Sequence, residues 1–175
     1  MRKFLIFAVT TSALLVVSLL CSTTACPTAE MRFGVHPNIM CLELPITGSR
    51  ADATLALWRA GDGAIASAAR RDTVADYGFL VFYGATMAVT GWLARKGSVP
   101  GAPAPALALI GAPLAAALAD AIENQGIFRM LAGTGPTSDV VAFATSIFAA
   151  LKFALLIVWI RAAARLVPDL PATAR

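Results

Sequence analysis

The chain has 175 residues, of which 58% are hydrophobic and only 14% charged, and its formal net charge is +4. A soluble domain is about half apolar and about a quarter charged, so this composition argues against an ordinary soluble protein. The basic residues lie beside apolar blocks and not along a stripe with interleaved aromatic residues, so we expect no nucleic-acid partner. The apolar blocks are four, at residues 4–20, 77–94, 106–131 and 140–160.

The first block follows Arg2 and Lys3 and precedes the small residues 22–25. It is either a retained membrane helix or a secretory signal that is removed, since a basic start, an apolar run and small residues are typical of both. Residues 25–26 also loosely match a lipoprotein-processing pattern. Both interpretations place the following segment on the outer side of the membrane.

The next segment, residues 21–72, is rich in charged residues and predicts an outer loop. Apolar and polar residues alternate roughly over residues 39–46, which predicts a short extended segment. Residues 47–49 are typical of a turn and a helix cap. Residues 50–60 predict a short amphipathic helix, because Ala51, Leu55 and Trp58 recur at helical spacing. Glycines at 61 and 63 break it, and a second helix starts near there and continues into the second block.

Blocks two to four are long enough to cross a bilayer, which takes about 20 residues. The third is longer than that, and Pro113 in its first half predicts a kink. Thr137 or Ser138 is expected to cap the fourth helix. Small residues in the second block, Gly84, Ala88 and Gly91, favour close helix approach, either within the bundle or in a dimer.

Basic residues at the ends of the blocks predict the orientation. All seven fall on one side if the chain crosses four times: Arg2, Lys3, Arg95, Lys96, Arg161, Arg165 and Arg175. Cytoplasmic flanks carry the excess of Lys and Arg, so we expect a multi-pass protein of the bacterial inner membrane. Both termini are then cytoplasmic if the first helix is retained. The expected fold is one all-α domain over residues 1–175, a four-transmembrane-helix bundle with a short extracytoplasmic helical loop between helices one and two.

The cysteines and the single histidine limit the possible chemistry. There is no CxxC pair and only His36, so we expect no metal site and no cofactor. Cys26 and Cys41 would face an oxidising compartment and are candidates for a disulfide. The alternatives are that both are unpaired, or that Cys26 carries lipid.

Ionisable residues inside the apolar blocks are the most informative feature. Asp120, Glu123 and Asn124 share one face of the third span, because they are spaced i, i+3 and i+4. Lys152 lies near the middle of the fourth span, at the same expected depth as Asp120. Charges at mid-bilayer cost about 2.5–3.5 kcal/mol each, so these groups should face one another.

We therefore expect Lys152 to pair with Asp120 or Glu123, which leaves one acid without a full counter-charge. Tyr83 and Asn124 are possible hydrogen-bond partners for that acid, and Asp76 shares a helix face with Tyr83. The candidate binding residues are Asp76, Tyr83, Asp120, Glu123, Asn124 and Lys152.

Several motifs resemble those of a group of uncharacterised bacterial four-helix inner-membrane proteins. The motifs, within about residues 40–160, are Leu42-Glu43-Leu44 with Thr47, Trp58 with Gly61, Asp76 with Phe79 and Tyr83, Asp120-x-x-Glu123-Asn124, and Lys152-Phe153. The resemblance implies a four-helix bundle and no particular activity. The small-residue processing signal after the first block departs from that group.

Two functions follow from these residues. The cluster either binds a small amphipathic ligand or a proton, or it only staples the helices of a structural or accessory subunit of a membrane complex. Lipid and a second copy or another membrane protein are the expected partners. An enzyme that uses a carboxyl as acid or base is the less favoured third possibility.

Overall fold

The computed structural model describes residues 39–60, 62–96 and 107–165, and these parts contain helices and no strands. Three helical segments are long and apolar enough to cross a membrane: α4 (Ala64–Lys96), the contiguous η1 (Leu107–Gly111) and α5 (Ala112–Ala132), and α6 (Asp139–Ala164). Two shorter helices precede them, α2 (Met40–Glu43) and α3 (Gly48–Arg59). The all-α prediction is confirmed for these residues. The expected first span, 4–20, lies outside them.

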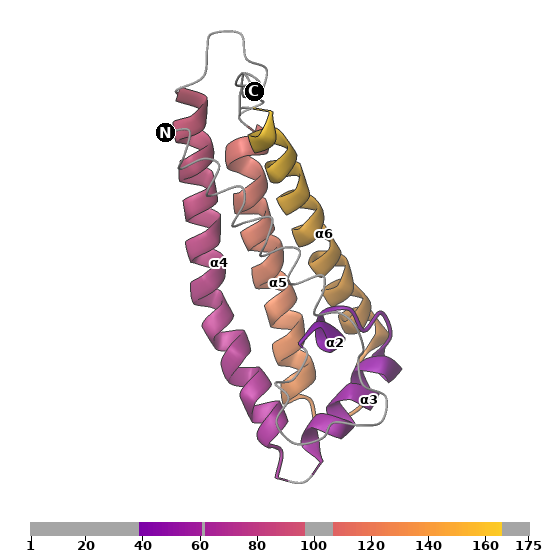
Figure 1. The fold of residues 1–175 in the computed structure, drawn as a ribbon. Coiled ribbons are helices and arrows are strands. Elements are labelled where there is room, and N and C mark those ends of the chain that lie inside the picture. The colour runs from indigo at the N-terminus through magenta and orange to yellow at the C-terminus, as the bar shows by residue number, and fades with distance from the viewer. Residues whose placement is uncertain (1–38, 61, 97–106, 166–175) are drawn as a thin grey trace, which may run out of the picture.

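The three long segments lie side by side in alternating directions, with α5 between α4 and α6 (Figure 1). Residues 39–60, here called the cap, lie at one end of this bundle, the cap end. The other end, where α4 ends and η1 begins, is the loop end. Large apolar side chains point outward, for example Val81, Phe82 and Leu118, each more than 60% exposed. Such faces suit contact with lipid, so the fold is consistent with an integral membrane protein that crosses the bilayer more than once.

Helix α3 forms as the sequence predicts. The Thr47 side chain caps it by accepting a hydrogen bond from the Arg50 backbone N–H, which satisfies one of the free donors at a helix start. The predicted stripe of Ala51, Leu55 and Trp58 is buried. This confirms the amphipathic helix.

The extended piece predicted at residues 39–46 is wrong. Residues 40–43 form the short helix α2, and all four of its side chains are buried. A helix of four residues is too short to show a period in the sequence or to form by local propensity alone. Its contacts with α5 and α6 stabilise it instead.

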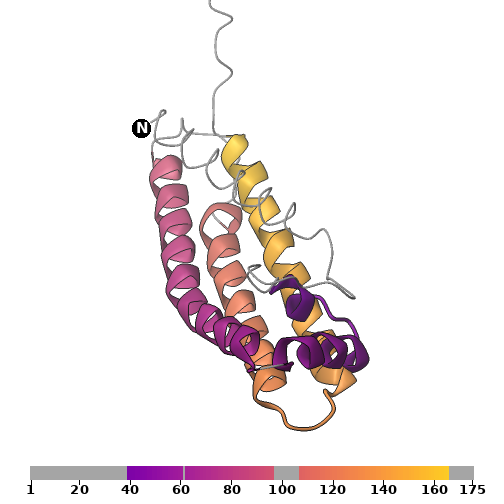
Figure 2. The same cartoon turned by 60° about the horizontal axis from the view of Figure 1, so that its bottom comes forward.

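The cap is hydrogen-bonded to the ends of α5 and α6, where α3 lies across the bundle (Figure 2). Arg59 Nη2 donates to three backbone carbonyls at the end of α5, those of Met130, Leu131 and Gly133, at 2.8–3.1 Å. Carbonyls at a helix C-terminus lack intrahelical partners, so a cation there supplies the missing donors. On the α6 side the bonds are Thr137 N to Asp52, Gly48 N to Asp139, and Ile46 N to Ser146.

The start of α6 also agrees with the prediction. Ser138 is its cap residue and accepts from the Val140 backbone N–H at 3.3 Å, and Asp139 lies in the first turn. A carboxylate in that position is favourable because the helix N-terminus carries partial positive charge.

Small residues of α4 allow it to approach α5 and η1 closely. A Cβ added at Gly84 would lie 2.9 Å from the Ala117 Cβ, and one added at Gly91 would overlap the Leu109 backbone. Packing within the bundle therefore explains both glycines.

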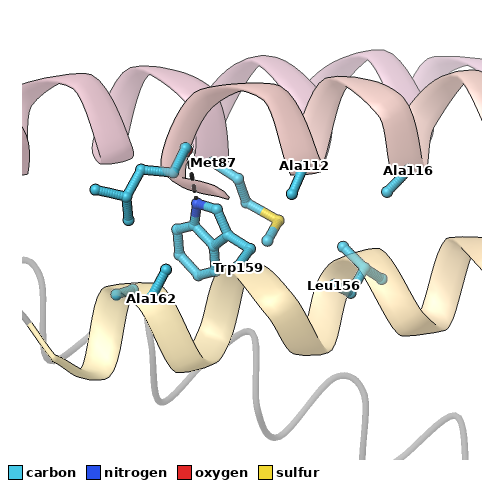
Figure 3. Packing of buried hydrophobic residues seen from close by; sticks show 8 residues of the cluster. Met87, Ala112, Ala116, Leu156, Trp159 and Ala162 are labelled. Atoms are coloured by element: carbon cyan, nitrogen blue, oxygen red, sulfur yellow. Dashed lines mark hydrogen bonds between the residues drawn. The ribbon is translucent and has the colours of Figure 1, made fainter. Parts of the chain in front are cut away.

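Apolar side chains fill the loop-end half of the bundle and form the apolar core (Figure 3). Its members are Met87, Leu109, Ala112, Ala116, Leu156, Trp159, Ala162 and Ala163. Pro113 lies beside this core and has no backbone N–H, so it cannot donate to the Leu109 carbonyl four residues earlier. The Trp159 indole N–H donates to that carbonyl instead, at 3.1 Å. Near the predicted kink the helix has π geometry, in η1, which ends two residues before Pro113.

Candidate functional site

Lys152 lies in the middle of α6 and its side chain is almost fully buried. Its ammonium nitrogen is 3.1 Å from Asp120 Oδ1 and 2.8 Å from Glu123 Oε2. The sequence predicted a pair with one of these two acids, and the structure places Lys152 against both. Similar depth on adjacent helices, expected from the spacing along each span, is therefore confirmed.

A third carboxyl reaches the same lysine from the cap. Glu43 Oε2 is 3.8 Å from Lys152 Nζ, and the side chain is buried between α2 and the long helices. Burial raises the pKa of the Glu43 carboxyl from its ordinary value, although the nearby Lys152 ammonium opposes that rise. We call Glu43, Asp120, Glu123 and Lys152 the charge cluster.

Glu43 was missed as a site residue when the sequence was considered alone. It lies in a segment that otherwise carries many charges, so it did not stand out as an acid in an apolar helix. The available signal was its local context, since Glu43 is the only charged residue in the run from residue 39 to 46. A lone acid in such a run deserves a candidate role whenever the run is predicted to be buried.

Both carboxyl oxygens of Asp120 have a partner. Its Oδ1 faces Lys152, and its Oδ2 accepts a hydrogen bond from the Tyr83 hydroxyl at 3.0 Å. The two oxygens thus bind one cation and one neutral donor from different helices. Asp120 is accordingly the acid best satisfied as a carboxylate.

Asn124 and Asp76 form a separate contact. The Asn124 amide donates to Asp76 Oδ2 at 2.8 Å and joins α5 to α4. Asn124 was expected as a partner for the unpaired acid of α5, but it binds Asp76 of α4 instead. Asn124 follows Asp120 by one turn on the same face of α5, and Asp76 precedes Tyr83 by two turns in α4. The antiparallel helices therefore bring Asn124 to Asp76 as they bring Asp120 to Tyr83.

Among the described residues, Glu123 has one cationic partner, the Lys152 ammonium 2.8 Å from its Oε2. Its side chain is 0% exposed, and neither carboxyl oxygen has a hydrogen bond of acceptable geometry among the described residues. Glu43 Oε2 is in the same condition. Unsatisfied buried oxygens are rare in native proteins, so these atoms mark the place where a ligand or proton would be gained.

The cluster contains three carboxyls and one ammonium. If all were ionised, it would hold a net charge of −2 in a region shielded from water. Among the described residues, no group of His, Cys, Asp or Glu side chains has an arrangement that could hold a metal ion.

Cys41 is disulfide-bonded, and it lies in the cap next to Leu42 of the same buried group. The other candidate, Cys26, lies outside the described residues. The Cys26–Cys41 pairing stays a prediction.

No protein-family model, curated protein or solved structure matches the chain. The geometry of the charge cluster is therefore the basis for proposing a function.

Proposed function

We propose that this chain is an integral membrane protein whose charge cluster binds a proton. The observation that carries the proposal is the imbalance of three buried carboxyls around the single Lys152 ammonium. Like charges this close in a medium of low dielectric constant cannot all be ionised, whereas one bound proton lowers the net charge to −1. Intramembrane ionisable groups with surplus charge are typical of proton-binding sites.

The test is an infrared spectrum of the purified protein in lipid nanodiscs at neutral pH. A bound proton gives the C=O stretch of a protonated carboxyl, which moves when the sample is transferred to D2O. Absence of this band in the wild-type protein contradicts the proposal.

A small amphipathic ligand is the second possible occupant of the same cluster. Its charged head would replace the proton as the partner of the surplus acid. Mass spectrometry of molecules that co-purify with wild type and with Asp120→Asn tests this. A ligand that is lost selectively in the variant favours it.

A structural role is the alternative function, and one observation favours it. Lys152 contacts acids from α2 and α5, so the cluster joins three elements. Polar contacts of this kind contribute on the order of 0.6–2 kcal/mol in membranes. If Asp120→Asn lowers only the melting temperature, and no proton or ligand is detected in wild type, the charge cluster has a structural role.

Basic residues support a proposed orientation in a bacterial inner membrane. Arg95 and Lys96 end α4 and Arg161 lies in the last turn of α6, at the same end of the bundle (Figure 1). Such residues favour the cytoplasmic side, which would place the cap outside. A reporter enzyme active only in the cytoplasm, fused after Arg175, tests this and should be active.

A further inference from the structure

Two acids of the charge cluster, Glu43 and Glu123, approach the same cation from different helices. Glu43 Oε2, from α2, and Glu123 Oε2, from α5, lie 3.8 and 2.8 Å from the same Lys152 ammonium nitrogen. A hydrogen bond between these two carboxyl groups would give both a further partner. An ionised carboxylate can only accept hydrogen bonds. Two carboxylates therefore cannot satisfy each other, and the bond forms only when one of them carries a proton.

Two other acids, Asp120 and Asp76, already accept hydrogen bonds from neighbouring side chains. Asp120 has Lys152 on one oxygen and the Tyr83 hydroxyl on the other. Asp76 accepts from the Asn124 amide. By contrast, Glu123 Oε1 has no hydrogen bond among the described residues, and Glu123 Oε2 and Glu43 Oε2 share the Lys152 ammonium at 2.8 and 3.8 Å.

We propose that Glu43 of the cap and Glu123 of α5 share the bound proton as one carboxyl–carboxylate pair. This inference rests on the proposed function and specifies the atoms that perform it. A proton between the two side chains makes one O–H···O bond, satisfies a buried oxygen on each side and leaves the pair with a single negative charge. The pair also couples the site to the cap, because one of its members comes from α2.

Every charged neighbour of the pair is part of this arrangement. Glu43 faces Lys152 from α6, Glu123 and Asp120 from α5, and Asp76 from α4. The one cation favours ionisation of Glu43, whereas Asp120 and Asp76 oppose it. Removing the proton would place two carboxylates against each other beside a lysine already bound to Asp120.

Isotope labelling of the wild-type protein tests the inference without any substitution. The chain has three glutamates, Glu30, Glu43 and Glu123. Carboxyl ¹³C labelling of glutamate alone should shift the protonated-carboxyl band, and labelling of aspartate alone should leave it in place. A band that moves only with aspartate labelling overturns the inference while the proposed function stands, and a wild type with no band overturns both.

Variants then locate the proton. Glu43→Gln and Glu123→Gln should each abolish the band, because an amide N–H can replace the shared proton in the bond to the remaining carboxylate. Glu30→Gln is the matched control and should keep it. A band that persists in both glutamine variants, or that disappears in Glu30→Gln, overturns the assignment to this pair.

Discussion

The two halves of the bundle use the same three helices and both bury apolar side chains, but among the described residues the buried ionisable side chains lie in the cap-end half. Three of the polar residues have a member of the apolar core one turn further toward the loop end: Met87 follows Tyr83, Ala116 precedes Asp120, and Leu156 follows Lys152. Thr90 is the one buried Ser, Thr or ionisable side chain in the loop-end half among the described residues.

This difference indicates how helices associate in lipid. Apolar side chains gain no hydrophobic free energy there by leaving lipid for a protein interior. The loop-end half is instead held by close packing at Gly91 and by the Trp159 hydrogen bond. The cap-end half is held by ion pairs. The first half should therefore be sensitive to volume and the second to charge.

The largest expected effect is from Lys152→Met in the cap-end half. It leaves three buried carboxyls without a cation, and loss of one partner of a buried pair costs about 3–5 kcal/mol. Unfolding in detergent, followed by circular dichroism, measures the change. Lys96→Met, at the exposed end of α4, is the control and should be close to neutral. Equal effects of the two would remove the distinction between buried and exposed charge.

The next largest effect is expected in the loop-end half. Gly91→Ala should destabilise by about 1–3 kcal/mol, because its Cβ would overlap the Leu109 backbone. Gly78 in the same helix has nothing within 4 Å of an added Cβ. Gly78→Ala should therefore stabilise by about 0.5–1 kcal/mol through the higher helix propensity of alanine. The same unfolding measurement compares them, and a Gly91→Ala variant as stable as Gly78→Ala would contradict the close packing.

An effect of similar size is expected from Trp159→Phe, which removes the indole donor to the Leu109 carbonyl. An unsatisfied buried carbonyl costs about 1–3 kcal/mol. Pro113→Ala supplies a backbone N–H at position 113, so Trp159→Phe should cost less in that background. A double-mutant cycle measures the difference. Additive effects would show that the indole and residue 113 do not serve the same carbonyl.

The smallest effect concerns pH. The pKa of Glu43 is raised in the folded protein, so its contribution to stability is fully present below its ordinary pKa and is lost as pH rises through the folded value. Melting temperature should therefore fall as pH rises above about 4.5, and Glu43→Gln should flatten this fall. Asp62→Asn in an exposed loop is the control. An identical pH profile for wild type and Glu43→Gln would contradict the role given to burial.

Sequence patterns predicted what depends on one helix at a time. The stripe of α3 and the shared face of Asp120 and Glu123 follow from helical spacing, and the depth of Lys152 follows from span length. Glu43 and Arg59 could not be found this way, because their roles depend on how the cap folds onto distant helices. The Trp159 bond to Leu109 likewise joins residues 50 positions apart.

That last bond has a consequence for biosynthesis. Until α6 arrives, α5 carries a carbonyl at Leu109 with no backbone donor at Pro113, together with two acids that lack their lysine. In hydrocarbon each unmet polar group is costly by several kcal/mol. We therefore expect α5 to stay at the translocon during synthesis until α6 emerges. The two helices should then enter the bilayer together as a helical hairpin.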